Sequence, residues 1–205
     1  MIAIIDYDAG NLRSVEKAFE FLGENVIVTR DKNEILSADG VVLPGVGAFK
    51  DAMNKLKQYE LISVIKEAVL LNKPFLGICL GMQLMYDYSE EGNTEGLKIL
   101  KGCVKRFPET SEFKVPQIGW NCLDVRKKSV LLKGTEDNPY VYFVHSYYVD
   151  AEDKETVVAQ IPYSKTADVL VESKNIMLTQ FHPEKSGETG LCLLKNFADF
   201  VRGAK

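Results

Sequence analysis

Apolar runs and amphipathic stretches alternate along the first half of the chain, and this alternation predicts its secondary structure. Short apolar runs predict buried strands at 2–5, 26–28, 40–43 and 75–78. Stretches whose apolar residues recur every three or four positions predict helices at 12–22, just after Asp31, and at 48–71 with a break near Tyr59. Gly23 lies where a helix would end, and Asp31 with Glu34 resembles a capping box. This order of elements predicts a parallel sheet with helices on both faces.

The second half of the chain has a different pattern, because short β-like runs replace the helices. They lie at 99–107, 115–123, 140–144, 147–149, 157–161, 169–172 and 176–181. Glycine, proline, asparagine and aspartate separate these runs, so several are expected to be antiparallel additions to the sheet. A polar surface loop is expected at 89–96, and an amphipathic C-terminal helix is marked by Leu191, Leu194, Phe197 and Val201. No linker or repeat divides the chain, which predicts a single domain over residues 1–205.

Cys79 lies where the period changes from strand to helix. A short apolar run precedes it, and the apolar residues after it recur every four positions, at Leu80, Leu84 and Tyr88. Gly77 and Gly81 flank the cysteine, which is typical of a nucleophile elbow, where small residues let the chain turn sharply. The N–H groups at the start of the following helix favour the thiolate. A buried structural cysteine at a tight turn shows the same local pattern, so the rest of the chain has to separate the two interpretations.

The composition is ordinary for a globular protein, with 46% hydrophobic and 26% charged residues. The net charge is −4 without long runs of like charge, so neither nucleic acid nor a membrane surface is an expected partner. No apolar stretch reaches the roughly 18 residues that span a bilayer, and no signal peptide is expected. The four cysteines are scattered, which argues against a zinc site or disulfides and indicates a reducing cytoplasm. No metal or cofactor is expected, and Asp6, Asp8, Glu90 and Glu91 are interpreted as solvated charges.

The chain contains only two histidines, so an imidazole base for Cys79 must be His145 or His182. His182 ends an apolar run, Pro183 stops the strand, and Glu184 follows two residues after the histidine. Side chains at i and i+2 of an extended segment share a face, so Glu184 can orient one imidazole nitrogen while the other faces Cys79. Nucleophile, base and orienting carboxylate together follow the logic of a catalytic triad. His145 has no carboxylate close in sequence and ranks second, and a plain surface turn at His182 is the competing interpretation.

Two glycines flank Val46 in the segment PGVG at 44–47 and leave its peptide groups sterically free. The backbone N–H of Val46, together with that of Leu80, is therefore a candidate oxyanion hole. Residues 44–47, Cys79 and residues 180–184 all follow predicted strands, whose carboxyl ends can meet at one rim of an α/β sheet. The residues thus predict cysteine-dependent acyl transfer or hydrolysis of a carboxamide, ester or thioester at that rim.

The segment GICLGMQ at 77–83, paired with HPE at 182–184, resembles the class I, triad-type glutamine amidotransferases, and the resemblance covers essentially the whole chain. It implies a flavodoxin-like α/β core with a mixed, mostly parallel central sheet and helices on both faces. It also implies that Cys79 attacks the side-chain amide of glutamine, releases ammonia and leaves a glutamyl thioester that water hydrolyses. His182 would then be the base and later the acid, with Glu184 as its orienting partner.

Five further segments are similar to the glutaminase subunits of imidazole glycerol phosphate synthases, which act in histidine biosynthesis. They are DYDAGNLRSV (6–15), LPGVGAF (43–49), PQIGWN (116–121), FVHSYY (143–148) and HPEKSG (182–187). This similarity implies that a separate (β/α)8-barrel cyclase subunit uses the ammonia. It implies that glutamine is held by Gly47, Gln83, Ser146 and Tyr147, with His145 in the pocket wall. It further implies that the cyclase is faced by Asn11, Trp120, Tyr142 and Lys185.

Three alternatives share part of this pattern. The glutaminase subunit of another class I amidotransferase, such as an anthranilate or aminodeoxychorismate synthase, has the same triad with different flanking segments and another partner. A stand-alone cysteine hydrolase or chaperone of related fold does not account for the histidine motif late in the chain. A non-catalytic flavodoxin-like interaction module would not need Cys79. If the chain is a regulated glutaminase, the rotatable Gly45–Val46 peptide is expected to be biased by partner binding.

Overall fold

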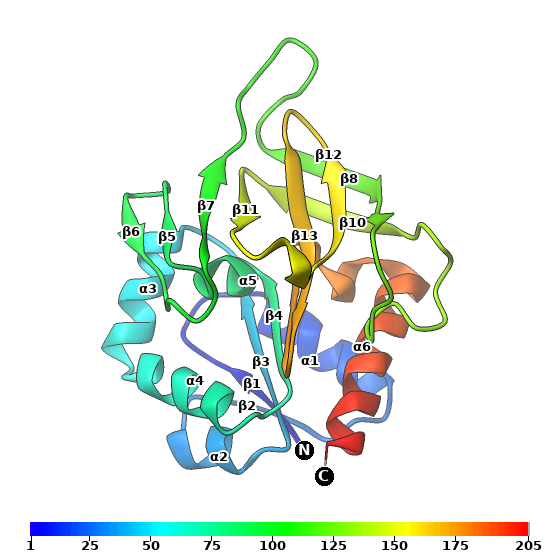
Figure 1. The fold of residues 1–205 in the computed structure, drawn as a ribbon. Helices are drawn as coiled ribbons and strands as arrows, with labels where there is room; N and C mark the ends of the chain where they lie inside the picture. Colours follow the sequence, from blue (N-terminus) through cyan, green and yellow to red (C-terminus); the bar gives the residue numbers. More distant parts are fainter. Residues whose placement is uncertain (205) are drawn as a thin grey trace.

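In the computed structural model, which describes residues 1–204, a twisted sheet runs through the molecule with helices packed on its faces (Figure 1). One half of this sheet is parallel, with strand order β2-β1-β3-β4-β14. Its strands are β1 (Ile2–Ile5), β2 (Val26–Thr29), β3 (Gly40–Gly45), β4 (Phe75–Cys79) and β14 (Ile176–Thr179). β4 pairs with β3 on one side and with β14 on the other, which brings segments from opposite ends of the chain to its flanks. The predicted parallel half is confirmed.

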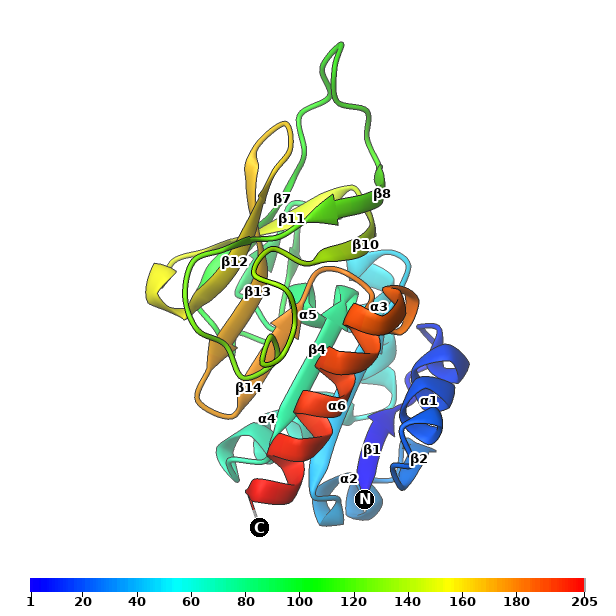
Figure 2. The ribbon, with the colours of Figure 1, turned by 90° about the vertical axis from the view of Figure 1, so that its right-hand side faces the viewer.

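Alternate residues of the parallel strands face two different layers of helices, which explains why β1, β3, β4 and β14 are buried throughout, whereas the edge strand β2 is only partly buried. Ile4 packs on the layer of α1 and α6, where the rings of Phe19 and Phe197 meet edge to face at 6.3 Å. Ile5 packs on the opposite layer, formed by α2, α3 and α4. Figure 2 shows α1 and α6 side by side on one face. The helices are α1 (Leu12–Phe21), α2 (Lys32–Ser37), α3 (Phe49–Gln58), α4 (Leu61–Leu70), α5 (Leu80–Leu84) and α6 (Gly187–Gly203).

Beyond β14 the sheet continues in the order β13-β11-β7-β5-β6, and β12 and β9 join it beside β13. Most of these pairings are antiparallel, so the whole sheet is mixed, as expected. The run predicted at 99–107 forms a strand only from Gly102 to Arg106. The strands are β5 (Tyr88–Ser89), β6 (Thr94–Glu95), β7 (Gly102–Arg106), β9 (Asp124–Val125), β11 (Tyr147–Ala151), β12 (Val157–Pro162) and β13 (Thr166–Ser173).

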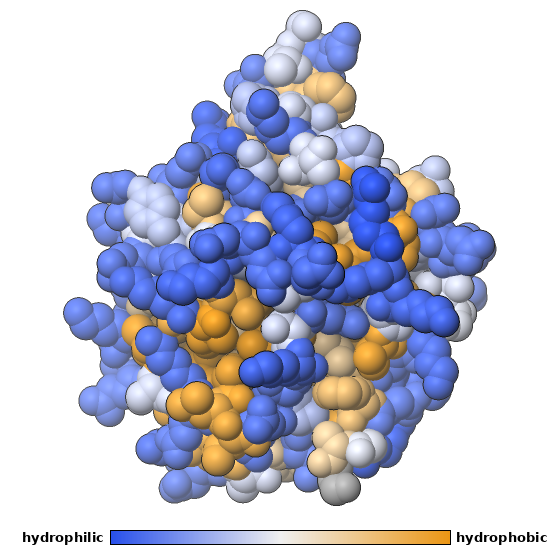
Figure 3. Space-filling view, in the orientation of Figure 1, coloured by the Kyte–Doolittle hydropathy of each residue, from blue (hydrophilic) through white to orange (hydrophobic). Residues whose placement is uncertain are grey.

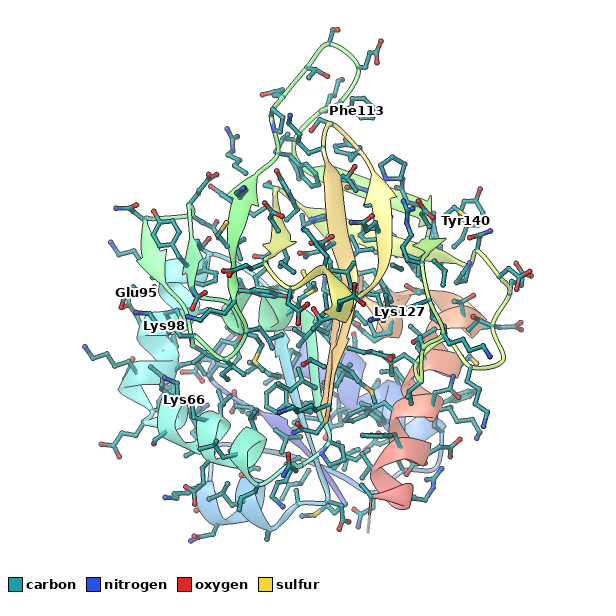
Figure 4. The ribbon with its side chains drawn as sticks, in the orientation of Figure 1. Lys66, Glu95, Lys98, Phe113, Lys127 and Tyr140 are labelled. Atoms are coloured by element: carbon teal, nitrogen blue, oxygen red, sulfur yellow. The ribbon has the colours of Figure 1, made fainter. Side chains whose placement is uncertain are left out.

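Two predicted strands form a separate two-stranded antiparallel sheet, made of β8 (Gln117–Cys122) and β10 (Tyr140–His145). Its inner face packs on the core, where the rings of Phe143 and Phe181 lie 5.8 Å apart. Its outer face carries the exposed side chains of Trp120 and Tyr140, and Figure 4 shows Tyr140 at the edge of the molecule. An extended loop that carries Phe113 projects between β7 and β8 (Figures 1 and 4).

Some local predictions are confirmed and others are wrong. The long helical region does break at Tyr59, and Gly23 has the positive φ of +78° typical of the residue after a helix. Helix α5 ends at Leu84, so Tyr88 lies in β5 instead, and the loop expected at 89–96 contains the β5–β6 hairpin. The carboxylate of Asp31 caps α2 by accepting from the N–H groups of residues 33 and 34. The capping box is incomplete, because the Glu34 carboxylate accepts from the Thr29 hydroxyl.

The face of the molecule shown in Figure 3 is mainly hydrophilic. An apolar area lies over and beside α4, where Leu70 and, just after the helix, Leu71 are exposed. Within residues 1–204, no helix combines the length and the apolar character needed to cross a membrane.

Candidate active site

Cys79 is the last residue of β4, and α5 begins at the next residue. Its backbone has φ 54° and ψ −109°, a conformation that a residue with a side chain rarely adopts. Such strain costs on the order of 1–3 kcal/mol and persists only where the surrounding packing imposes it. The side chain is nearly buried, at 7% exposure. The predicted strand–turn–helix geometry of a nucleophile elbow is therefore present.

Gly77 and Gly81 are required by close packing rather than by turning freedom. A Cβ atom at Gly77 would lie 2.6 Å from Cδ2 of Leu178 on β14. A Cβ atom at Gly81 would overlap the backbone carbonyl of Leu43 on β3. The strained backbone belongs to Cys79 itself, whereas the glycines let α5 lie directly on the sheet. The position of the elbow was therefore predicted correctly. The predicted reason for the glycines, freedom to turn, is replaced by close packing against the sheet.

His182 and Glu184 form the contact that the sequence predicted. Nδ1 of His182 lies 2.7 Å from Oε1 of Glu184, and the two side chains are only 2% and 1% exposed. The predicted reason for this contact is wrong, because the segment is not extended. β14 already ends at Thr179, and residues Pro183–Lys185 form the 3-10 turn η2. This turn folds the carboxylate back onto the imidazole.

The backbone of His182 is anchored to the two-stranded sheet. Its N–H donates to the carbonyl of Tyr142 on β10 at 3.0 Å. The hydroxyl of Ser186 donates to the carbonyl of His182 at 2.7 Å and accepts from the N–H of Tyr142 at 3.0 Å. These three bonds give the imidazole a defined position relative to β10, so the triad and the outer sheet form one connected unit.

The charge on His182 is set by two opposing effects. Burial lowers the pKa of the imidazole, but the Cys79 sulfur and the Glu184 carboxylate favour the imidazolium more strongly and raise the pKa to about 9. Nε2 of His182 is buried and has no hydrogen-bond partner within residues 1–204. Nε2 is therefore available to form a hydrogen bond with the Cys79 sulfur or with a reacting group in the same cavity.

We expect kcat for glutamine hydrolysis to fall as the pH rises through about 9. The imidazolium donates a proton to the leaving nitrogen, and above this pH the donor is lost. Initial rates of glutamate release at saturating glutamine, from neutral to alkaline pH and at constant ionic strength, measure the effect. A rate that stays constant through this range would contradict the assignment.

His145 is not suited to be the base. Burial lowers its pKa to about 4, so the ring is neutral near neutral pH. Its Nδ1 lies 2.8 Å from the carbonyl of Tyr147, which assigns the proton to Nδ1. The rings of Phe107 and Phe143 pack against it at 5.3 and 5.5 Å. These contacts agree with a residue of the pocket wall.

A cavity of ≈ 400 Å³ lies at the carboxyl ends of β3 and β4. Cys79 and His182 line it, and so do all four residues that were expected to hold glutamine, namely Gly47, Gln83, Ser146 and Tyr147. Val46 and Leu80 line it as well. A donor role for their N–H groups stays a prediction. The three segments expected at one rim therefore do meet there.

Buried amide side chains hold the cavity wall in place. Nε2 of Gln83 donates to the carbonyl of Tyr147 at 3.0 Å and to Oε1 of Gln180 at 2.9 Å. The Tyr147 carbonyl also accepts a hydrogen bond from Nδ1 of His145, so the bonds from Gln83 and His145 together fix this part of the wall. Gln180 in turn donates to the sulfur of Cys79 at 3.6 Å. Gln180 belongs to the segment 180–184 that was expected at this rim, but no role was predicted for its side chain.

Glu91 also lines the cavity, which corrects its interpretation as a solvated charge. Its Oε2 accepts from the N–H of Phe49 at 2.8 Å, at the start of α3. Glu90 is exposed, as expected of a solvated charge, and its carboxylate also accepts from the N–H of Arg106 at 2.8 Å. Polarity alone does not show which charged side chain a distant loop brings to a pocket.

The residues expected to face a partner lie on connected elements. Trp120 and Tyr142 are opposite each other in the β8–β10 pair, with ring centroids 6.0 Å apart, and Trp120 is 53% exposed. Lys185 is exposed at the end of η2, directly after Glu184. Asn11 is half-buried at the start of α1, and both α1 and β10 contact η2. Their role toward a partner stays a prediction.

A wider depression of ≈ 980 Å³ lies beside the loop between β9 and β10, away from the triad. Surface lysines and arginine line much of it, together with Glu172. The Glu172 carboxylate is engaged by the Ser129 hydroxyl and by the N–H groups of residues 130 and 131. Within residues 1–204, no group of three or more His, Cys, Asp or Glu side chains could hold a metal ion.

Comparisons with known proteins agree with this geometry. The model of the family "Glutamine amidotransferase class-I" matches residues 3–200. Imidazole glycerol phosphate synthase subunit HisH of Oceanobacillus iheyensis is 50% identical over 203 residues, which cover 98% of this chain and 100% of that protein. The protein of the same name from Methanosarcina acetivorans is 50% identical over 200 residues, which cover 97% and 98%.

Two solved structures show the same fold at low sequence identity. A crystal structure of a glutamine amidotransferase has a TM-score of 0.77 at 16% identity and covers 98% of this chain and 100% of that chain. A structure of PurLQS from Thermotoga maritima has a TM-score of 0.73 at 19% identity and covers 98% of each chain. The flavodoxin-like architecture expected from the sequence is confirmed. From the match along its length and the relatives at half identity, the chain belongs to the class I glutamine amidotransferase family.

Proposed function

We propose that the chain is the glutaminase subunit of an imidazole glycerol phosphate synthase. It hydrolyses glutamine to glutamate and ammonia, and a separate (β/α)8-barrel cyclase subunit consumes the ammonia in histidine biosynthesis. The observation that carries the proposal is that Cys79 and His182 line one cavity, while Glu184 contacts His182 from outside it and the backbone of His182 is hydrogen-bonded to β10. The relatives named as HisH subunits support this synthase over others.

In the first half of the reaction, the Cys79 thiolate attacks the amide carbon of glutamine. A C–S bond forms and the carbonyl electron pair moves to oxygen, where the N–H groups of Val46 and Leu80 donate to the oxyanion. The His182 imidazolium then gives its proton to the amide nitrogen. The C–N bond breaks, and ammonia and a glutamyl thioester result.

In the second half, the now neutral His182 takes a proton from water as the water oxygen attacks the thioester carbon. The C–S bond breaks, its electron pair returns to Cys79 as thiolate, and glutamate leaves. Throughout the cycle Glu184 holds Nδ1–H of His182, so that Nε2 carries out both proton transfers.

The charged end of glutamine is bound by residues of the cavity lining other than the triad. Gly47, Gln83, Ser146 and Tyr147 hold the α-amino and α-carboxylate groups, since all four line the cavity. Glu91 is the single carboxylate among the described lining residues, and it neutralises the α-ammonium group of the substrate.

The partner binds on the outer face of the β8–β10 sheet. Trp120 and Tyr142 supply the aromatic contacts that are enriched at protein interfaces, and Asn11 and Lys185 lie on the adjoining elements. This face adjoins the triad, because the carbonyl of Tyr142 accepts from the N–H of His182, and we expect ammonia to leave toward it. All four cysteines are free thiols, which agrees with a cytoplasmic location.

We expect slow glutamate release by the chain alone and a strong rise when the cyclase of the histidine pathway is added with its nucleotide ligand. The cyclase concentration that gives half of the rise should increase about tenfold or more in Trp120→Ala, because an interface aromatic residue is lost. Leu70→Ala is the matched control, since Leu70 is 81% exposed on α4, away from the β8–β10 sheet.

Two outcomes would change the proposal. High release that does not respond to the cyclase would keep the glutaminase but assign it to another synthase, such as one for anthranilate or aminodeoxychorismate. No release under either condition, with the protein folded, would exclude the glutaminase altogether.

A further inference from the structure

Tyr7 is a buried tyrosine that the proposed mechanism does not use. It follows β1, is 0% exposed, and donates its hydroxyl hydrogen to the carbonyl of Pro44 at 2.9 Å. Pro44 precedes Gly45, which pairs with Cys79 in the register of β3 and β4. The Tyr7 hydroxyl therefore binds the short segment that continues into the cavity wall at Val46.

The same hydroxyl packs directly against Gly45. A Cβ atom at Gly45 would lie 2.5 Å from the Tyr7 oxygen and 2.9 Å from Cβ of Leu80. Gly45 is thus enclosed on its inner side and cannot move toward the core. The next residue, Val46, is 41% exposed, so the constraint ends at the peptide that joins Gly45 to Val46.

The backbone on both sides of Tyr7 is held from outside by an ion cluster. Nη2 of Arg30 donates to Asp6 and to Asp8, each at 2.6 Å, and the hydroxyl of Tyr59 also donates to Asp8. The N–H of Asp8 donates to Asp6 at 3.0 Å. These aspartates were interpreted as solvated charges, and both side chains do remain accessible to solvent, at 26% and 40% exposure, but they are ion-paired as well. They hold the backbone that positions the Tyr7 ring.

We propose that Tyr7 is a positioning residue for the glutaminase reaction, which fixes Pro44 and Gly45 so that the Gly45–Val46 peptide can present its N–H to the oxyanion. The proposal rests on the proposed function, because it needs the oxyanion of amide hydrolysis. Burial raises the pKa of Tyr7 above its usual range, with a further contribution from Cys79, so the hydroxyl remains a donor across the working pH range.

In Tyr7→Phe the Pro44 carbonyl loses its buried donor while the ring and its packing remain. The segment at 44–46 is then held less tightly, and the Val46 N–H meets the oxyanion less often. We expect kcat to fall about 10- to 100-fold, somewhat less than the 10²–10³ that loss of a whole oxyanion donor causes. The KM for glutamine should change little, because Gln83, Ser146 and Tyr147, three of the four residues proposed to hold its α-groups, lie on other segments.

Tyr86→Phe is the matched control. Tyr86 is also buried, at 1% exposure, and burial likewise raises the pKa of its phenol, but its hydroxyl has no hydrogen-bond partner within residues 1–204. Both variants and the wild type are assayed with the cyclase for kcat and KM. Alkylation of Cys79 by iodoacetamide, which needs no oxyanion hole, and thermal unfolding are measured beside them.

The inference is supported if Tyr7→Phe loses kcat while KM and the alkylation rate remain near those of the wild type and Tyr86→Phe is unaffected. An undiminished kcat in Tyr7→Phe overturns it. Parallel losses of kcat and alkylation, or equal losses in both variants, also overturn it, since they indicate damage to Cys79 or to the core. Absence of activity in the wild type refutes the proposed function, and this inference with it.

Discussion

Replacing Cys79 with serine is expected to lower kcat for glutamine hydrolysis by roughly 10⁵-fold or more, the scale seen when a protease nucleophile is removed. A serine hydroxyl is far less acidic than a thiol, and the contribution of Cys79 to the raised pKa of His182 is lost with the sulfur. The variant therefore lacks the anionic nucleophile and the thiolate–imidazolium pair on which the proposed reaction depends. Glutamate release, with thermal unfolding as a check on the fold, measures the effect.

Cys192→Ser is the control for this experiment. Cys192 is half-buried in α6 and does not line the cavity, so its loss should leave glutamate release unchanged. Retention of more than a few per cent of activity in Cys79→Ser, beside an unchanged control, would remove Cys79 from the role of nucleophile.

Replacing Glu184 with glutamine is expected to lower kcat by about 10³–10⁴-fold, by comparison with loss of the triad carboxylate in serine proteases. The change keeps the size of a side chain that is 1% exposed but removes the negative charge that favours the imidazolium. The pKa of His182 should then move below 9. The alkaline decline of any residual activity should therefore start at a lower pH than in the wild type.

Glu188→Gln separates this effect from a general change in net charge. Glu188 lies exposed in the first turn of α6, four residues along the chain, and its loss should change neither kcat nor the pH profile. A Glu184→Gln enzyme with the wild-type pH profile, whatever its rate, would show that the carboxylate does not stabilise the charge on His182.

The sequence by itself determined the features that depend on residues close together in the chain. The change from a strand to a helix at Cys79 is visible in the spacing of apolar residues, and the alternating first half predicted the parallel sheet. His182 and Glu184 are two positions apart, so their contact needs almost no long-range information. That nearness explains why the prediction succeeded although the segment is a 3-10 turn and not extended.

Only the tertiary structure decided the features that depend on residues far apart in the chain. Glu91 reaches the cavity beside Phe49, 42 positions away, and Gln180 meets Gln83 across 97 positions. A polar side chain looks the same in sequence whether water or a buried partner satisfies it, so its place follows from packing alone. The pairing of β8 with β10 apart from the main sheet was settled in the same way, since strand partners depend on which faces the whole chain can bury.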